Sequence, residues 1–117
     1  MARTTKIDSV AFTGQSGSVH TFRMYVWDTK FKAVPGVYVV ASRSIEPGHK
    51  ARYEPVFVGV ADDLSIVLAK HPRTDCFQLY YANVIGVLQE TDAAARENIA
   101  ADLVAALTPP CNAPDAE

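Results

Sequence analysis

The chain has 117 residues, a formal net charge of −2, and 49% hydrophobic against 21% charged residues. These values predict one globular domain with a core of its own, and they argue against a protein that binds nucleic acid mainly by charge. No apolar run approaches the roughly 20 residues of a membrane-spanning helix, and no signal-peptide pattern follows Met1. We therefore expect a cytoplasmic protein without a membrane partner.

Residues 10–13 and 19–27 have the aromatic and β-branched content of strands, and the second run alternates along its length. The Gly-Gln-Ser-Gly segment between them, residues 14–17, is typical of a turn rather than a phosphate loop. The two runs predict a hairpin within an N-terminal extension, residues 1–33. Such a hairpin can extend a sheet, cover an edge or pair with a second chain, and Phe22, Tyr25 and Trp27 can feed that interface.

Two short apolar runs, residues 37–41 and 56–60, predict strands that are buried on both faces. The segment between them, residues 43–54, contains Pro47, Gly48 and five charged residues, so we expect a polar loop there.

A short helix is predicted after the second run. Asp62 and Asp63 suit a helix N-terminus, and one helical face then carries Leu64, Val67, Leu68 and His71. Pro72 should end this helix. Residues 77–81 fit either a helix or a strand, and residues 84–88 predict another strand.

The last predicted element is a helix that Thr91 or Asp92 can cap. Its apolar stripe contains Ile99, Leu103 and Leu107, and Pro109 with Pro110 should stop it. The order of elements predicts an α/β domain with helices flanking a small mixed sheet in two or three layers. Residues 35–112 form its core and residues 113–117 a tail.

Cys76 and Cys111 are 35 positions apart, which is not the pattern of a disulfide framework. In a reducing compartment they are most simply free, buried thiols, and a disulfide between them is the alternative. Their spacing with His71 does not fit a zinc site.

An ordered set of motifs resembles the GIY-YIG nuclease superfamily. Gly36-Val37-Tyr38 and Phe57-Val58-Gly59 stand where that family has its two tripeptides, a helix near Asp63-Leu64 leads to His71, and a later helix leads to Pro110-Cys111-Asn112. The resemblance covers residues 35–112. It implies a nuclease fold in which a tyrosine helps to activate water, an arginine stabilises the phosphate and a glutamate holds one divalent cation.

The family's chemistry is largely substituted in this chain. Tyr38 and His71 are kept, but Phe57 lacks the second hydroxyl, Val67 replaces the arginine, and Ala100 replaces the metal-binding glutamate. The resemblance thus implies a catalytically inactive domain with no metal and no cofactor.

We therefore expect a binding module for a protein or nucleic-acid partner. The residues expected to contact the partner are Tyr38, Gly59, Lys70, His71, Arg73 and Asn112. Three of them also have plain structural interpretations: Tyr38 can serve packing, His71 a helix end, and Asn112 the docking of the last helix.

Two alternatives remain open. One is an active Mg²⁺- or Mn²⁺-dependent endonuclease that uses Tyr38, His71 and Glu97, with Lys70 or Arg73 in place of the lost arginine; otherwise Glu97 is a surface charge that can pair with Arg96 or Arg43. The other is an unrelated α/β module, which would hold if residues 37–40 and 56–60 were not neighbouring strands. The sequence does not define an oligomeric state.

Overall fold

The computed structural model describes residues 6–27, 29–67 and 71–112. In chain order its elements are β1 (Asp8–Thr13), β2 (Val19–Val26), β3 (Gly36–Glu46), β4 (Lys50–Ala61), α1 (Leu64–Val67), α2 (Thr74–Leu79), β5 (Val84–Gln89), α3 (Ala93–Leu107) and the 3-10 turn η1 (Pro110–Asn112). No described helix is both long enough and apolar enough to cross a membrane.

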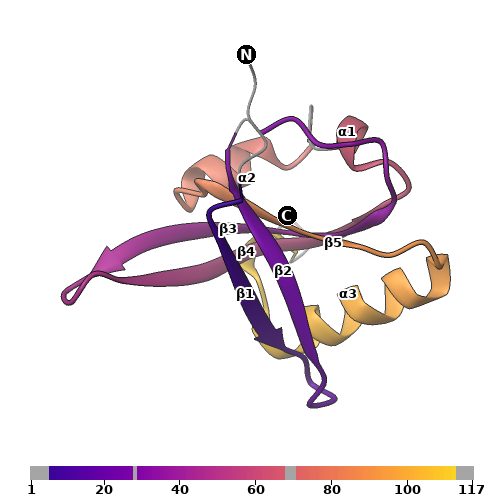
Figure 1. The fold of residues 1–117 in the computed structure, drawn as a ribbon, viewed down its shortest axis with the longest axis horizontal. Helices are drawn as coiled ribbons and strands as arrows, with labels where there is room; N and C mark the ends of the chain where they lie inside the picture. The colour runs from indigo at the N-terminus through magenta and orange to yellow at the C-terminus, as the bar shows by residue number, and fades with distance from the viewer. Residues whose placement is uncertain (1–5, 28, 68–70, 113–117) are drawn as a thin grey trace, which may run out of the picture.

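The five described strands form one sheet in the order β1-β2-β5-β3-β4. Every neighbouring pair is antiparallel, so the predicted mixed sheet is wrong. The reason lies in β5, which enters between β2 and β3 and runs opposite to both of them. The sheet is strongly twisted: β1 and β2 run steeply across the view of Figure 1, whereas β3 and β4 run nearly horizontally.

The N-terminal hairpin extends this sheet, because β2 pairs with β5 and places Met24 opposite Gly86. Phe22 is fully buried in the core, so the idea that it feeds an interface is wrong. The rings of Tyr25 and Trp27 lie against neighbours of this chain instead, at centroid distances of 5.4 Å from Phe31 and 6.0 Å from Phe77.

The polar loop predicted at residues 43–54 is wrong, because β3 and β4 continue through it as a hairpin arm (Figure 1). On the β4 side of the arm the exposed charges Lys50, Arg52 and Glu54 occupy every second position, which is the period of a strand rather than of a loop. Only residues 47–49 turn, with positive φ at Gly48 (91°) and His49 (64°).

Strand alternation divides the core between the two faces of the sheet. Val37 and Val39 of β3 belong to the cluster that α3 covers with Leu103. Tyr38 and Val40 belong to the cluster on the opposite face, which includes Leu64 of α1 and Phe77 of α2. The domain therefore has three layers, with α1 and α2 on one side and α3 on the other (Figure 1).

Helix α3 follows the prediction closely. The Asp92 side chain caps it by accepting a hydrogen bond from the Ala95 N–H, at 2.9 Å. Leu103 is fully buried, and Ile99 and Leu107 pack against the same cluster. The helix ends at Leu107, followed by a left-handed Thr108 and then the two prolines.

The predicted helix that runs to His71 is wrong. Within the described residues α1 ends at Val67, His71 is not helical, and a separate helix, α2, starts at Thr74. Pro72 accounts for the non-helical conformation of His71, because a residue that precedes proline avoids the helical region. Leu68 and Lys70 lie outside the described residues. Phe77 belongs to α2, which resolves the ambiguous segment.

Candidate functional site

Four of the family-related positions come together on the face of the sheet that α1 and α2 cover. They are Tyr38, Phe57, Val67 and His71. The rings of Tyr38 and Phe57 lie 5.9 Å apart, and the His71 ring is 5.0 Å from Phe57. Phe77 closes the group at 4.8 Å from His71, and Val67 packs against the same cluster. We call Tyr38, Phe57, His71 and Phe77 the aromatic cluster.

The polar contact inside the aromatic cluster joins Tyr38 to His71. The His71 Nδ1 accepts a hydrogen bond from the Arg73 N–H at 3.0 Å, so this nitrogen carries no hydrogen. In the neutral ring the hydrogen is therefore on Nε2, which donates to the Tyr38 hydroxyl oxygen at 2.7 Å. Burial raises the pKa of Tyr38, while burial and the Arg73 charge lower the pKa of His71. Both side chains are thus held in their neutral forms.

Gly59 has a packing reason for lacking a side chain. It pairs with Tyr38 across the β3–β4 register, and the Tyr38 ring lies over it. A Cβ at Gly59 would come within 2.6 Å of both Cζ and the hydroxyl oxygen of Tyr38, and within 2.8 Å of Cε2 of Phe57. Gly59 therefore positions the aromatic cluster.

The position that corresponds to the metal-binding glutamate does not join this group. Ala100 lies on α3 and packs against the core on the other face of the sheet, so the sheet separates it from Tyr38. Glu97 is exposed on the same helix. Its two suggested cationic partners are engaged elsewhere: Arg96 donates to Asp62 Oδ1 at 2.7 Å, and Arg43 Nε donates to the Tyr53 hydroxyl at 2.9 Å.

Asn112 acts as an extra strand partner at the β4 edge of the sheet. Its Oδ1 accepts from the Val58 N–H at 2.7 Å, and its Nδ2 donates to the Val58 carbonyl oxygen at 2.8 Å. These bonds satisfy both backbone groups of an edge residue. The structural interpretation of Asn112 is confirmed, because these bonds hold the segment that follows α3 against the sheet.

Cys76 of α2 and Cys111 of η1 form a disulfide, with their Cα atoms 5.9 Å apart. The prediction of free thiols is therefore wrong. The two cysteines meet because η1 packs back against β4, on the face that α2 covers. The described residues contain no group of three or more His, Cys, Asp and Glu side chains arranged to hold a metal ion.

Arg73 is the remaining predicted binding residue that the structure describes. Arg73 directly precedes α2 and contributes its backbone N–H to His71. Lys70 lies outside the described residues.

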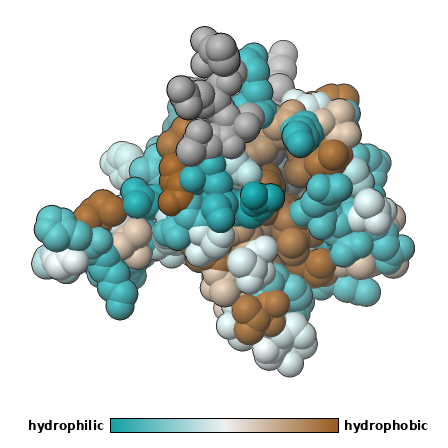
Figure 2. Space-filling model, in the orientation of Figure 1, coloured by the Kyte–Doolittle hydropathy of each residue, from teal (hydrophilic) through white to brown (hydrophobic). Residues whose placement is uncertain are grey.

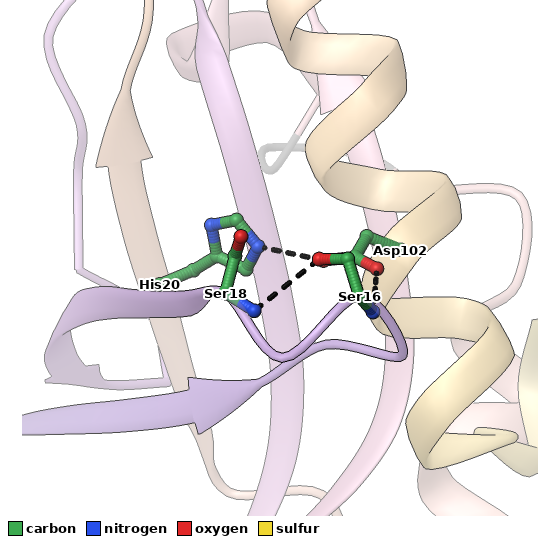
Figure 3. A network of polar contacts seen from close by, with 4 residues as sticks. All are labelled: Ser16, Ser18, His20 and Asp102. Carbon is green, nitrogen blue, oxygen red and sulfur yellow. Dashed lines mark hydrogen bonds and ion pairs between the residues drawn. The ribbon is translucent and has the colours of Figure 1, made fainter.

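A second polar group, which sequence reasoning missed, joins the β1–β2 turn to α3 (Figure 3). The Asp102 carboxylate accepts bonds from the Ser16 N–H and Ser16 hydroxyl, both at 2.8 Å, and it lies 3.1 Å from His20 Nε2. The bond to His20, followed by those from Ser16, lowers the pKa of Asp102. These residues lie more than 80 positions apart, so no local pattern reports their contact.

A pocket of about 300 Å³ opens at this polar group. The residues that line it are Ser16, Ser18, His20, Asn98, Ile99 and Asp102. It lies between the hairpin extension and α3, away from the aromatic cluster.

No protein-family model, curated protein or solved structure matches the chain. The relationship to the GIY-YIG nucleases thus stays a prediction from motif order.

Proposed function

We propose that the chain is a catalytically inactive GIY-YIG-like domain that serves as a binding module for a protein partner. The observation that carries this proposal is the state of Tyr38, the retained tyrosine of the family. Its side chain is 3% exposed, and its hydroxyl is already bonded to His71. A hydroxyl in that position does not reach water or a phosphodiester in the described conformation.

The surroundings of Tyr38 support the same proposal. Phe57 and Val67 contribute only apolar atoms to this face, where a nuclease would need hydrogen-bond donors for phosphate. Ala100 supplies no carboxylate and lies on the opposite face. The active-endonuclease alternative gains no support. Glu97 is exposed on α3, whereas Tyr38 and His71 are bonded to each other on the opposite face of the sheet.

The exposed apolar residues favour a protein as partner. Most of the surface in Figure 2 is hydrophilic, with separate hydrophobic spots. Consecutive exposed apolar residues occur where α2 ends, with Leu79 70% exposed and Tyr81 83% exposed on either side of Tyr80. Tyrosine is enriched in protein interfaces, and the net charge of −2 gives little attraction for nucleic acid.

Two measurements test this proposal together. Fluorescence anisotropy with a labelled DNA duplex should show weak binding or none at low salt, and tight binding that collapses with salt would contradict a protein partner. Proteins captured from a lysate should be lost when Leu79 and Tyr81 are both changed to Ser, but kept in the matched control Val19→Ser. Val19 is also exposed and apolar, and it lies on β2 at the hairpin turn. Equal loss in both variants would show that the end of α2 is not the specific contact with the partner.

A further inference from the structure

The contact between the β1–β2 turn and α3 contains more than docking requires (Figure 3). Three hydrogen bonds already hold the turn to Asp102: from the Gln15 N–H to its backbone oxygen, and from the Ser16 N–H and hydroxyl to its carboxylate. His20 adds a fourth contact from β2, beyond the turn. We propose that His20 and Asp102 form a general-base site that hydrolyses small neutral esters. This activity does not depend on the binding role proposed above, because it uses none of the aromatic cluster.

Asp102 fixes the orientation and the hydrogen position of the His20 ring. The carboxylate accepts two hydrogen bonds from Ser16, and a Cβ at Gly14 would collide with it, so the turn is shaped around this group. An ionised carboxylate 3.1 Å from Nε2 requires a hydrogen on that nitrogen. The neutral ring then has its lone pair on Nδ1, for which the described part of the chain supplies no hydrogen-bond partner. A carboxylate that orients a histidine also stabilises the imidazolium that forms when the ring accepts a proton.

The pocket defines the kind of substrate. Its volume of about 300 Å³ is at the lower end of ligand pockets, which suits a small molecule. Among the described lining residues, Asp102 contributes a negative charge and none is Arg or Lys. A phosphate or carboxylate substrate is therefore disfavoured, because its negative charge would be repelled by Asp102. Ile99 gives an apolar wall, while Ser18 and Asn98 carry groups that can donate hydrogen bonds to a carbonyl oxygen.

The reaction needs only water as a second reactant. His20 Nδ1 accepts a proton from a water molecule as the water oxygen bonds to the ester carbonyl carbon, and the carbonyl π electrons move onto the oxygen. When the C=O bond re-forms, the carbon–oxygen bond to the leaving alkoxide breaks, and the alkoxide takes the proton from His20. The products are the carboxylic acid and the alcohol, and His20 returns to its neutral form.

The test follows the release of p-nitrophenol from p-nitrophenyl acetate at a series of substrate concentrations. We expect a saturable rate above that of the same concentration of free imidazole, and a fall of at least about 10-fold in kcat/KM for His20→Gln. Glutamine keeps a donor toward Asp102, so the fold should survive, which thermal melting checks. The matched control is His49→Gln, because His49 is an exposed histidine in the β3–β4 turn. Equal rates in the wild type and a folded His20→Gln variant would overturn the proposal.

Asp102 is the positioning residue, and it has a readout that a merely structural role would not move. In Asp102→Asn the imidazolium that forms in the reaction loses its stabilising charge, so kcat should fall while KM stays close to that of the wild type. If a variant does not fold, the wild type alone decides: a rate that does not saturate, or that is no greater than that of free imidazole across the pH range, overturns the proposal.

Discussion

Replacing Gly59 with alanine tests the link between Gly59 and the aromatic cluster. The new methyl group would lie 2.6 Å from Cζ and from the hydroxyl oxygen of Tyr38, well inside ordinary van der Waals contact of 3.4 Å or more. Tyr38 is 3% exposed and is flanked by Phe57 and His71, so its ring has little room to move. Overpacking of this kind costs about 1–3 kcal/mol. For 117 residues the entropy of unfolding is about 0.25 kcal/mol/K, which converts this cost to a fall in Tm of about 4–12 °C.

A double-mutant cycle assigns that cost to the right contact. Tyr38→Leu removes Cζ and the hydroxyl, so Gly59→Ala should cost clearly less in that background than in the wild type. We expect a coupling free energy of about 1–2 kcal/mol from thermal or urea unfolding of the four proteins. A Gly59→Ala protein with the Tm of the wild type, or purely additive effects, would refute the close approach of the Tyr38 ring to Gly59.

Three further predictions concern stability. Reducing the disulfide should lower the free energy of unfolding by about 4 kcal/mol, as loop closure predicts for cysteines 35 positions apart. A thiol reagent should label the unfolded chain only after reduction, and labelling without reduction would contradict the disulfide. The contacts of Asp102 lower its pKa in the folded state, so their contribution to stability is complete above the unfolded pKa of about 4 and is lost as the pH falls through the folded pKa. The Tm of the wild type should therefore decline more steeply in acid than that of Asp102→Asn. Parallel declines would count against this linkage. Asn112→Asp should destabilise the fold by about 1–3 kcal/mol in chemical unfolding, because one carboxylate oxygen then faces the Val58 carbonyl, whereas an unchanged midpoint would show that the edge contact contributes nothing.

Local sequence patterns predicted most of the elements. The alternation in residues 19–27, the apolar runs at residues 37–41 and 56–60, and the capped stripe of α3 all correspond to strands and a helix at those places. The strands that contain Tyr38 and Gly59 are neighbours, as the motif order requires. These features depend on side-chain period and capping, which act within a few residues.

The errors arose where contacts between segments, rather than a pattern within one segment, decide the outcome. The charges of the β3–β4 arm suggested a loop, yet Arg52 pairs with Glu46 and Glu54 within a hairpin. The direction of β5 depends on where it enters the sheet, which no local pattern encodes. Likewise, the disulfide and the contact of Asp102 with the turn join residues far apart in the chain, so neither had a sequence signal.

We propose that the closed, packed face around Tyr38 does not cleave DNA, and the most direct test is plasmid cleavage. Supercoiled plasmid is incubated with the purified protein and Mg²⁺ or Mn²⁺, beside the Tyr38→Phe and Glu97→Gln variants. We predict that the plasmid stays supercoiled with all three proteins. Cleavage by the wild type that is absent in Tyr38→Phe would contradict this proposal. If cleavage were also absent in the separate Glu97→Gln variant, the active-endonuclease alternative would be established.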